Sequence, residues 1–220
     1  NSVSHALEYY VADNALAAFA REMGDVAFAE ELERRAAGWR NYYSEEVGAM
    51  RPRDMEGNFI TPFDPTAGAN FSNTVGFHEG SSWNYTFFVP HDVEGLMKVM
   101  GGKRNFVNKL WSIFEDGYYD PTNEPDIAYP YLFSRVKGEE WRTQHLVKQL
   151  LEENYSTLPD GLPGNDDTGT MSAWALFSMM GLYPDCPGMP YYTLTTPCFE
   201  RVEIDTPQGV VTITTEGEGD

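Results

Sequence analysis

SHALEYYVADNALAAFARE (residues 4–22) and GDVAFAEELERRAAGWRNYY (residues 24–43) decide the fold of this 220-residue chain. Apolar residues recur at helical spacing in both segments, which predicts two amphipathic helices. The spaced residues are Leu7, Val11, Ala15, Ala18 and Phe19 in the first segment, and Val26, Phe28, Ala29, Leu32, Ala36, Trp39 and Tyr43 in the second. Gly24 breaks the pattern, and Asp25 is a suitable N-cap for the second helix. Two helices joined by so short a turn form an antiparallel hairpin.

Further helices are predicted along most of the remaining chain, separated by loops rich in Gly, Pro, Asp and Asn. The helical segments are residues 79–88, 92–100, 103–114, 127–136, 139–155 and 171–181, and residues 44–78 form a long loop. β-Branched residues alternate only in residues 191–196, 201–205 and 210–215, which predicts strands. The pattern therefore predicts a mainly α fold, with part of an (α/α)6 toroid in residues 1–185 and the start of a C-terminal β segment in residues 186–220.

The charge balance argues against several classes of partner. The chain has 34 acidic and 15 basic residues, a net charge of −19, which repels phosphate backbones and anionic lipid headgroups. We therefore expect no nucleic acid partner, and no apolar run is long enough for a membrane span. The charge suits a neutral substrate or a bound cation, although solubility alone would also explain it. Cys186 and Cys198 either form a disulfide or remain two thiols, and their spacing matches no metal-binding pattern.

Three loops concentrate carboxylates and amides, and each precedes a helix. They are HEGSSWNY (residues 78–85), DPTNEPD (residues 120–126) and GNDDTG (residues 164–169). Helix capping explains any single acid among them. Taken together, they offer the two carboxyl groups that hydrolysis of a glycosidic bond requires, one on each side of the sugar. Asn123-Glu124 and Asn165-Asp166-Asp167 also offer oxygen ligands that suit calcium, although their spacing is not that of an EF-hand.

Three longer stretches resemble the bacterial exo-α-mannosidases of glycoside hydrolase family 92. They read HEGSSWNYTFFVPHDVEGLMKVMGG (residues 78–102), TNEPDIAYPYLF (residues 122–133) and DGLPGNDDTGTMSAWALFSMMGLYP (residues 160–184), in the order found in the family. The resemblance implies a longer enzyme, with an N-terminal β-sandwich and a catalytic toroid of which this chain covers the latter part. It also implies an α-mannoside glycan as substrate, the N-terminal remainder of the enzyme as partner, no activity of this chain alone, and a bacterial protein that is secreted, periplasmic or attached to the cell surface.

The family is inverting and calcium-dependent, and its functional residues fall on positions of this chain. Its general acid, the Glu of an E-G-x-x-W motif, falls on Glu79, and its general base falls on Asp167. Inversion requires the two carboxyl groups to lie about 6.5–9.5 Å apart. The Asn-Glu of the family's N-E-P motif, a calcium site, matches Asn123 and Glu124, with the Asn contributing its backbone carbonyl.

The same resemblance assigns a substrate-binding role to residues around these positions. They are Trp83, His91, Asp92, Asp120, Asn165 and Asp166. Two of them depart from the family. Asn165 stands where many members have an acid, and Asp120 follows Tyr119 where members that cut α-1,2 bonds often have His-Glu. The glycan linkage therefore stays open.

Three other interpretations remain at this stage. The chain could be a non-catalytic, calcium-dependent carbohydrate-binding domain, which would need Asn123 and Glu124 but not the pair Glu79 and Asp167. It could be another α/α-toroid glycosidase with a different sugar preference. Finally, the acids could cap helices only, and a lone histidine such as His91 near a helix start is more often structural than catalytic.

Overall fold

The computed structural model describes residues 2–68 and 72–217. By its internal contacts the chain divides into two compact units, one of residues Asn1–Tyr129 with Cys186–Pro190, and one of residues Pro130–Asp185 with Tyr191–Asp220. Each unit is described by itself below. Across the described residues, none of the helices has both the length and the apolar character needed to cross a membrane.

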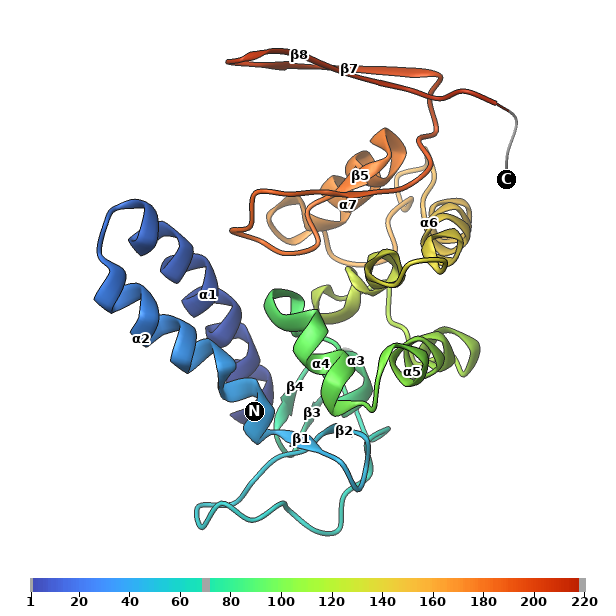
Figure 1. Ribbon diagram of the computed structural model, residues 1–220. Helices are drawn as coiled ribbons and strands as arrows, with labels where there is room; N and C mark the ends of the chain where they lie inside the picture. The colour runs from blue at the N-terminus through green and yellow to red at the C-terminus, as the bar shows by residue number, and fades with distance from the viewer. Residues whose placement is uncertain (1, 69–71, 218–220) are drawn as a thin grey trace. The chain divides into compact units, whose positions relative to one another are not determined.

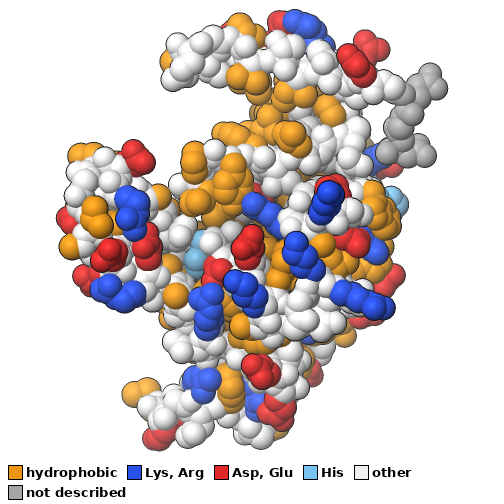
Figure 2. Space-filling view, in the orientation of Figure 1, with side chains coloured by type: hydrophobic (Ala, Val, Ile, Leu, Met, Phe, Trp, Pro, Cys, Tyr) orange, Lys and Arg blue, Asp and Glu red, His pale blue; other side chains and the backbone are white. Residues whose placement is uncertain are grey.

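The first unit begins with the predicted helical hairpin, formed by α1 (Ser2–Glu22) and α2 (Val26–Ala36) (Figure 1). Asp25 caps α2 as predicted, since its Oδ1 accepts a hydrogen bond from the backbone N–H of Phe28 at 3.2 Å. Apolar residues of both helices are buried between them, and charged side chains of both signs cover their outer surface (Figure 2).

The second helix is shorter than predicted. After Ala36 the chain tightens into the 3₁₀ helix η1 (Ala37–Asn41), and Tyr43 already belongs to a strand. Gly38 lies directly against the ring of Tyr10: a Cβ at Gly38 would stand 2.8 Å from Tyr10 Cζ, so a larger residue would require the Tyr10 ring to move. Gly188 makes a similar close contact, because a Cβ there would lie 2.5 Å from Ala15 Cβ. This contact packs the segment Cys186–Pro190 onto α1.

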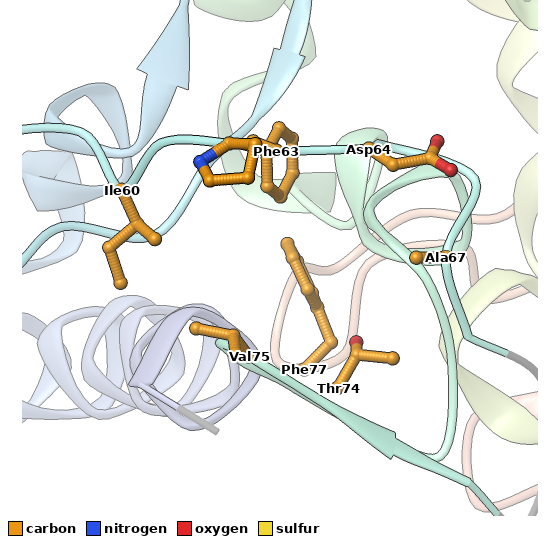
Figure 3. A pocket seen from close by; sticks show the side chains of 8 residues that line it. Ile60, Phe63, Asp64, Ala67, Thr74, Val75 and Phe77 are labelled. Carbon is orange, nitrogen blue, oxygen red and sulfur yellow. The ribbon is translucent and has the colours of Figure 1, made fainter.

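The long loop is ordered by two short antiparallel pairs, β1 (Tyr43–Ser44) with β2 (Ala49–Met50) and β3 (Asn73–Thr74) with β4 (Phe77–His78). Between them the loop borders an apolar hollow of about 550 Å³, into which Phe63 and Phe77 point (Figure 3). The buried side chain of Arg51 donates to the Ile60 carbonyl at 3.0 Å and to Thr61 Oγ1 at 2.7 Å. These bonds replace the regular ladder that the loop lacks.

The remaining elements of the first unit are helices. They are α3 (Ser82–Thr86), η2 (Pro90–Asp92), α4 (Val93–Val99), α5 (Lys103–Glu115) and η3 (Glu124–Asp126). Asp92 caps α4 as predicted, because its Oδ1 accepts from the Gly95 N–H at 3.0 Å. The helix predicted over residues 79–88 is reduced to α3, since Glu79 has a left-handed φ of 49° and Ser81 with Asn84 forms a capping box.

The second unit contains α6 (Glu140–Asn154), η5 (Asp167–Gly169) and α7 (Thr170–Met180), and η4 (Tyr129–Arg135) leads into it from the first. Where a regular helix was predicted over residues 127–136, residues 127–128 form a turn and Tyr129–Arg135, which include Pro130, form the 3₁₀ helix η4. Thr143 Oγ1 of α6 donates to the Pro130 carbonyl at 2.8 Å, and Tyr131 stacks on Tyr183 with ring centroids 4.3 Å apart. These contacts join η4 to α6 and to β5.

β5 (Leu182–Tyr183) pairs with β6 (Thr193–Leu194), and β7 (Arg201–Thr206) pairs with β8 (Gly209–Thr214) in an antiparallel hairpin. The three predicted strands correspond to β6, β7 and β8, whereas β5, like β1 to β4, was not predicted. Cys186 is buried, Cys198 is exposed, and the two do not form a disulfide. The described residues thus form a mainly helical chain with short strands near its C-terminal end, as predicted.

Candidate active site

Glu79 lies between β4 and α3, in a backbone conformation that a residue with a side chain rarely adopts. Its φ is 49°, and such a conformation costs about 1–3 kcal/mol unless its surroundings hold it. Asn123 Nδ2 donates a hydrogen bond of 3.0 Å to the Glu79 carbonyl. The Glu79 side chain stays 37% exposed, with Oε1 3.6 Å from His78 Nε2. The strained backbone therefore presents a carboxylate to solvent.

Asn123 and Glu124 meet Glu79 through that hydrogen bond. The Asn123 side chain also caps η3, since its Oδ1 accepts from the Glu124 N–H at 3.1 Å. Burial and, to a smaller extent, the charge of Glu124 raise the pKa of Glu8, which places Glu8 of α1 near the same group. One acid from α1, one from the β4–α3 turn and one from η3 thus face a common region of the first unit.

Asp126 fixes the loops that carry these residues. Its side chain is fully buried, and its Oδ2 accepts from Asn84 Nδ2 at 2.9 Å and from the Asp120 N–H at 3.0 Å. Its Oδ1 has no hydrogen-bond partner among the described residues. Burial raises the pKa of Asp126 well above its usual range. Because Asn84 belongs to the capping box of α3, Asp126 joins α3 to the Asp120 loop.

Trp83 belongs to α3 and Asp120 to the loop, the two segments that Asp126 connects. Trp83 stacks on Tyr118, with ring centroids 5.3 Å apart and an angle of 8° between the planes, and Lys109 Nζ lies 4.2 Å from the Trp83 ring centroid. Asp120 Oδ1 accepts from the Thr122 N–H at 2.9 Å, which closes a turn of the loop. The structure thus links Glu79, Asn123 and Glu124 by hydrogen bonds, and through Asp126 it joins α3, which carries Trp83, to the loop that carries Asp120.

His91 and Asp92 have different surroundings. His91 Nε2 donates to the Ala36 carbonyl at 3.2 Å, and burial lowers the pKa of His91. Asp92 Oδ2 accepts from Trp39 Nε1 at 3.1 Å and from Arg40, while its Oδ1 caps α4. His91 thus contacts the end of α2, Asp92 contacts η1 and α4, and their substrate-binding role stays a prediction.

The acidic loop before α7 belongs to the second unit. Asp166 accepts from the Ser172 N–H at 2.9 Å and from Ser172 Oγ at 2.6 Å, and these bonds lower the pKa of Asp166. Asp166 therefore anchors the first turn of α7. Asp167 is exposed, and its carbonyl accepts from Thr170 Oγ1 at 2.7 Å. Among the described residues its carboxylate has no hydrogen-bond donor, so it faces solvent beside exposed Asn165.

A metal would have to be held here by oxygen atoms of mixed origin. No group of three or more His, Cys, Asp or Glu side chains within residues 2–68 and 72–217 is arranged to hold a metal ion. Calcium does not require one, because it also takes backbone and amide carbonyls and water. The oxygen-only donors around Asn123 and Glu124, with the unpartnered and buried Asp126 Oδ1 nearby in the chain, fit a hard cation of this kind.

Glu8, Asn84 and Asp126 received no site role from the sequence. Asp126 lies in the loop that the sequence singled out, and only its complete burial reveals that it organises this loop. Glu8 shares α1 with three other charged residues, Asp13, Arg21 and Glu22, and nothing in its local sequence separates it from them. Proximity to residues more than a hundred positions away distinguishes it.

Comparison with known proteins gives one consistent result. The model of the glycosyl hydrolase family 92 catalytic domain matches residues 1–220. A curated protein of Arthroderma benhamiae, described as an uncharacterized secreted glycosidase, is 28% identical over 225 residues, covering 94% of this chain and 29% of that protein.

Two solved structures from Bacteroides thetaiotaomicron are similar over 99% of this chain. One is a family GH92 α-mannosidase in complex with mannoimidazole, with 30% identity, a TM-score of 0.91 and 31% of its own chain covered. The other is a family GH92 inverting mannosidase, with 31% identity, a TM-score of 0.86 and 32% covered. The predicted fold, part of an α/α toroid, is confirmed, and the chain spans about a third of the length of the proteins that it matches.

Proposed function

Because the chain belongs to glycosyl hydrolase family 92, we propose that it forms part of the catalytic domain of a calcium-dependent exo-α-mannosidase, which removes terminal α-mannose units from glycans with inversion. One observation carries this proposal: the 3.0 Å hydrogen bond from Asn123 Nδ2 to the carbonyl of Glu79. It joins the acid of the predicted E-G-x-x-W motif to the Asn-Glu pair of the predicted metal site, from loops 44 residues apart in sequence.

Glu79 acts as the general acid in this proposal. Its carboxyl group protonates the oxygen of the departing sugar, so that the leaving group departs as a neutral alcohol. The left-handed backbone at Glu79 supports this role over a purely capping role, because a strained residue held by a specific hydrogen bond is typical of catalytic positions. Its half-exposed side chain leaves room for a substrate oxygen.

Asp167 acts as the general base. Among the described residues, none donates a hydrogen bond to the Asp167 carboxylate, so this carboxylate can accept a proton from water. Asp166, and not Asp167, holds the first turn of α7. Water activated by Asp167 attacks the anomeric carbon from the face opposite Glu79, with the two carboxyl groups about 6.5–9.5 Å apart in the assembled site. That geometry inverts the configuration in a single displacement.

Asn123 and Glu124 would hold the calcium ion, Asn123 through its backbone carbonyl and Glu124 through its carboxylate. A calcium ion held by these residues would supply a positive charge that helps to orient the mannose hydroxyl groups. The hydrogen bond from Asn123 to Glu79 then couples the position of the acid to that of the metal ligands. Asp126 supports both by fixing the loop that carries them.

The remaining predicted residues would contact the glycan or order its surroundings. Trp83 and Asp120 are proposed to bind the sugar, as are Asn165 and Asp166 from the acidic loop. His91 and Asp92 are proposed to bind it as well, in addition to the contact of His91 with α2 and that of Asp92 with η1. The N-terminal remainder of the enzyme would complete the site, and the name of the Arthroderma benhamiae relative supports secretion.

A kinetic comparison of two leaving groups tests the proposal. In the complete enzyme, Glu79→Gln should abolish hydrolysis of α-mannobiose, a loss of at least about 10³-fold, while an activated aryl mannoside keeps most of its kcat because its leaving group needs no proton. A chelator should remove the activity of the unmodified enzyme, and calcium should restore it. Equal losses on both substrates would exclude Glu79 as the acid, and activity that survives chelation would exclude the metal.

A further inference from the structure

A second hollow, of about 610 Å³, opens beside Trp83 in the first unit. The β1–β2 turn, α3, the end of α4 and one face of α5 form its walls, on which lie Tyr43, Glu45, Trp83, Asn105, Asn108 and Lys109. The hollow at Phe63 and Phe77 is mostly apolar, and its one carboxylate, Asp64, is occupied by hydrogen bonds from Thr66. The hollow beside Trp83 instead mixes aromatic rings, amides, a carboxylate and an ammonium group.

Lys109 is the group in this hollow that most needs a ligand. Its Nζ lies 4.2 Å from the centroid of the Trp83 ring, and burial lowers the pKa of Lys109. Within the described part of the chain, no carboxylate lies within ion-pair distance of Nζ, and no acceptor receives a hydrogen bond from it. An ammonium group carries three donors, so a partly buried one gains from any ligand that brings oxygen atoms to it.

The β1–β2 turn lies across the hollow from Lys109 and leaves its ammonium group accessible to a ligand. Gly48 has a φ of 68°, and a Cβ at that position would lie 3.6 Å from Lys109 Nζ, so a longer side chain would cover it. Asn105 and Asn108 are exposed on the same helix as Lys109, one turn and one residue before it, and present amide groups to the hollow. A ligand in the hollow would therefore meet donors from α5 and the aromatic ring of Tyr43, because Tyr118 and Lys109 already cover the two faces of the Trp83 ring.

The charges select the class of ligand. An anion would gain from Lys109 but would also meet Glu45 in the same wall and a chain of net charge −19. A sugar has hydroxyl groups that both donate and accept, so it satisfies Glu45 as well as Lys109, and its C–H faces pack on aromatic rings. We propose that this hollow binds a sugar unit of the glycan other than the mannose that is cleaved, with Lys109 and Asn108 as hydrogen-bond donors. The choice of a mannose-based glycan rests on the proposed function.

Binding measurements can test the hollow separately from hydrolysis. The complete enzyme carrying Glu79→Gln is titrated by calorimetry with methyl α-mannoside, which offers one sugar, and with an α-mannotriose, which offers further units. Lys109→Met and Asn108→Ala are added one at a time to this background. Lys98→Met, an exposed lysine of α4 outside the hollow, is the matched control.

Each of Lys109→Met and Asn108→Ala should lower the affinity for mannotriose relative to that for methyl mannoside, by about tenfold for Lys109→Met, as expected for losing a hydrogen bond from a charged donor. Lys98→Met should leave the ratio unchanged. If Lys109→Met disturbs the packing of Trp83, Asn108→Ala still tests the proposal, because Asn108 is exposed and its replacement leaves that packing intact. An unchanged ratio in both variants, an equal loss for both ligands, or no binding of either ligand would overturn the proposal. If the unmodified enzyme hydrolyses no α-mannoside and the ratio still responds, the proposed catalytic function fails and the sugar site stands.

Discussion

The backbone of Glu79 and the side chain of Asn123 show how a single residue position depends on a distant one. A φ of 49° is costly for Glu79 alone, and the hydrogen bond that Asn123 donates to its carbonyl offsets part of that cost. For His91, the predicted role and the observed contact differ. The sequence resemblance gives it a substrate-binding role, while its described contact is a hydrogen bond to the Ala36 carbonyl. The two roles can be separated by titration.

Burial lowers the pKa of His91, so the folded protein binds a proton there less tightly than the unfolded chain, whose His pKa is about 6.5. The stability contributed by neutral His91 is therefore present above pH about 6.5. It is lost as the pH falls toward the folded-state pKa, by about 1.4 kcal/mol per pH unit. His91→Asn should remove this dependence in thermal unfolding of the complete enzyme between pH 7.5 and about 5. The control variant His145→Asn, at an exposed position of α6, should keep the same loss of stability as the pH falls. Parallel curves for the unmodified enzyme and His91→Asn would contradict the structural role.

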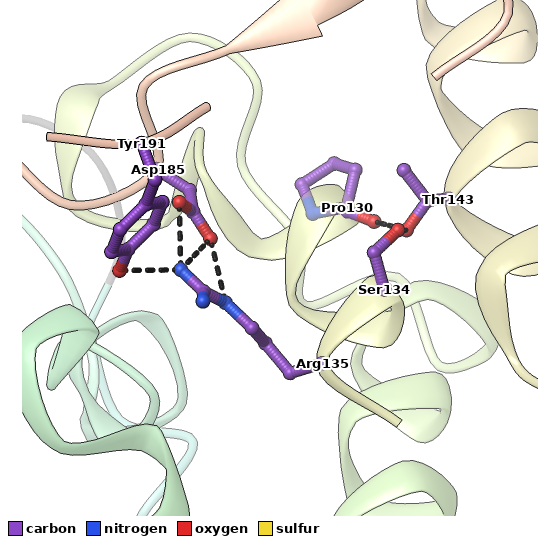
Figure 4. Close-up of polar contacts among 6 residues, drawn as sticks. All are labelled: Pro130, Ser134, Arg135, Thr143, Asp185 and Tyr191. Carbon is purple, nitrogen blue, oxygen red and sulfur yellow. Dashed lines mark hydrogen bonds and ion pairs between the residues drawn. The ribbon is translucent and has the colours of Figure 1, made fainter. Parts of the chain in front are cut away.

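At the scale of elements, one buried ion pair fixes the chain after β5. Arg135, at the end of η4, donates to both carboxylate oxygens of Asp185 and to the Tyr191 hydroxyl (Figure 4). The Asp185 side chain is only 1% exposed, and burial raises the pKa of Asp185 even though Arg135 opposes that shift. Asp185 and Tyr191 flank the segment that packs on α1, so this ion pair fastens both ends of that segment.

Removing one partner of this pair should be costly. Arg135→Met leaves the Asp185 carboxylate buried without a counter-charge, and we expect a loss of about 3–5 kcal/mol in the free energy of unfolding. Adding Asp185→Asn should recover part of this loss, since no buried charge then remains. Arg21→Met, which breaks the exposed pair of Arg21 and Glu33, should cost less than about 1 kcal/mol. Denaturant titration of the complete enzyme measures all three, and equal effects of Arg135→Met and Arg21→Met would show that the pair does not stabilise the fold.

At the scale of the whole molecule, the proposed catalytic residues belong to two different units. Glu79, Asn123 and Glu124 belong to the first unit and Asp167 to the second. The chain spans 29–32% of the relatives that it matches. Large apolar residues also stand exposed on α1, where Tyr9, Phe19 and Met23 each keep more than 60% of their surface in contact with solvent. Such a surface is typical of an interface.

The chain produced alone should therefore hydrolyse no aryl mannoside and should associate with itself through α1. Tyr9→Ser with Phe19→Ser should reduce this association, because it removes apolar surface without touching the core. Light scattering after size exclusion measures the association, and release of nitrophenol measures the activity. A monomeric, active chain would show that these residues suffice without the rest of the enzyme.

The sequence by itself determined the helices, several of their caps and the strands near the C-terminus. Spacing at 3.6 residues and capping at Asp25 and Asp92 depend on neighbours in the chain, so the pattern of residues is enough to predict them. Long motifs also led to the family. Regular helix was predicted but not found in residues 37–43, 79–81 and 127–136. The chain instead forms the 3₁₀ helix η1 after Ala36, a left-handed turn at Glu79 and 3₁₀ turns around Pro130.

Only the tertiary structure decided how the candidate site is held together. Asn123 reaches Glu79 across 44 residues, and Asp126 reaches Asn84 across 42. No local pattern specifies such pairs, because they form only when separate loops are packed against each other. The burial of Asp126, the ammonium group of Lys109 beside Trp83 and the separation of His91 from the Glu79 contacts were decided in the same way. The spacing of residues along the chain specifies helices and strands. Burial between distant segments determines which polar side chains remain accessible to a substrate or ligand.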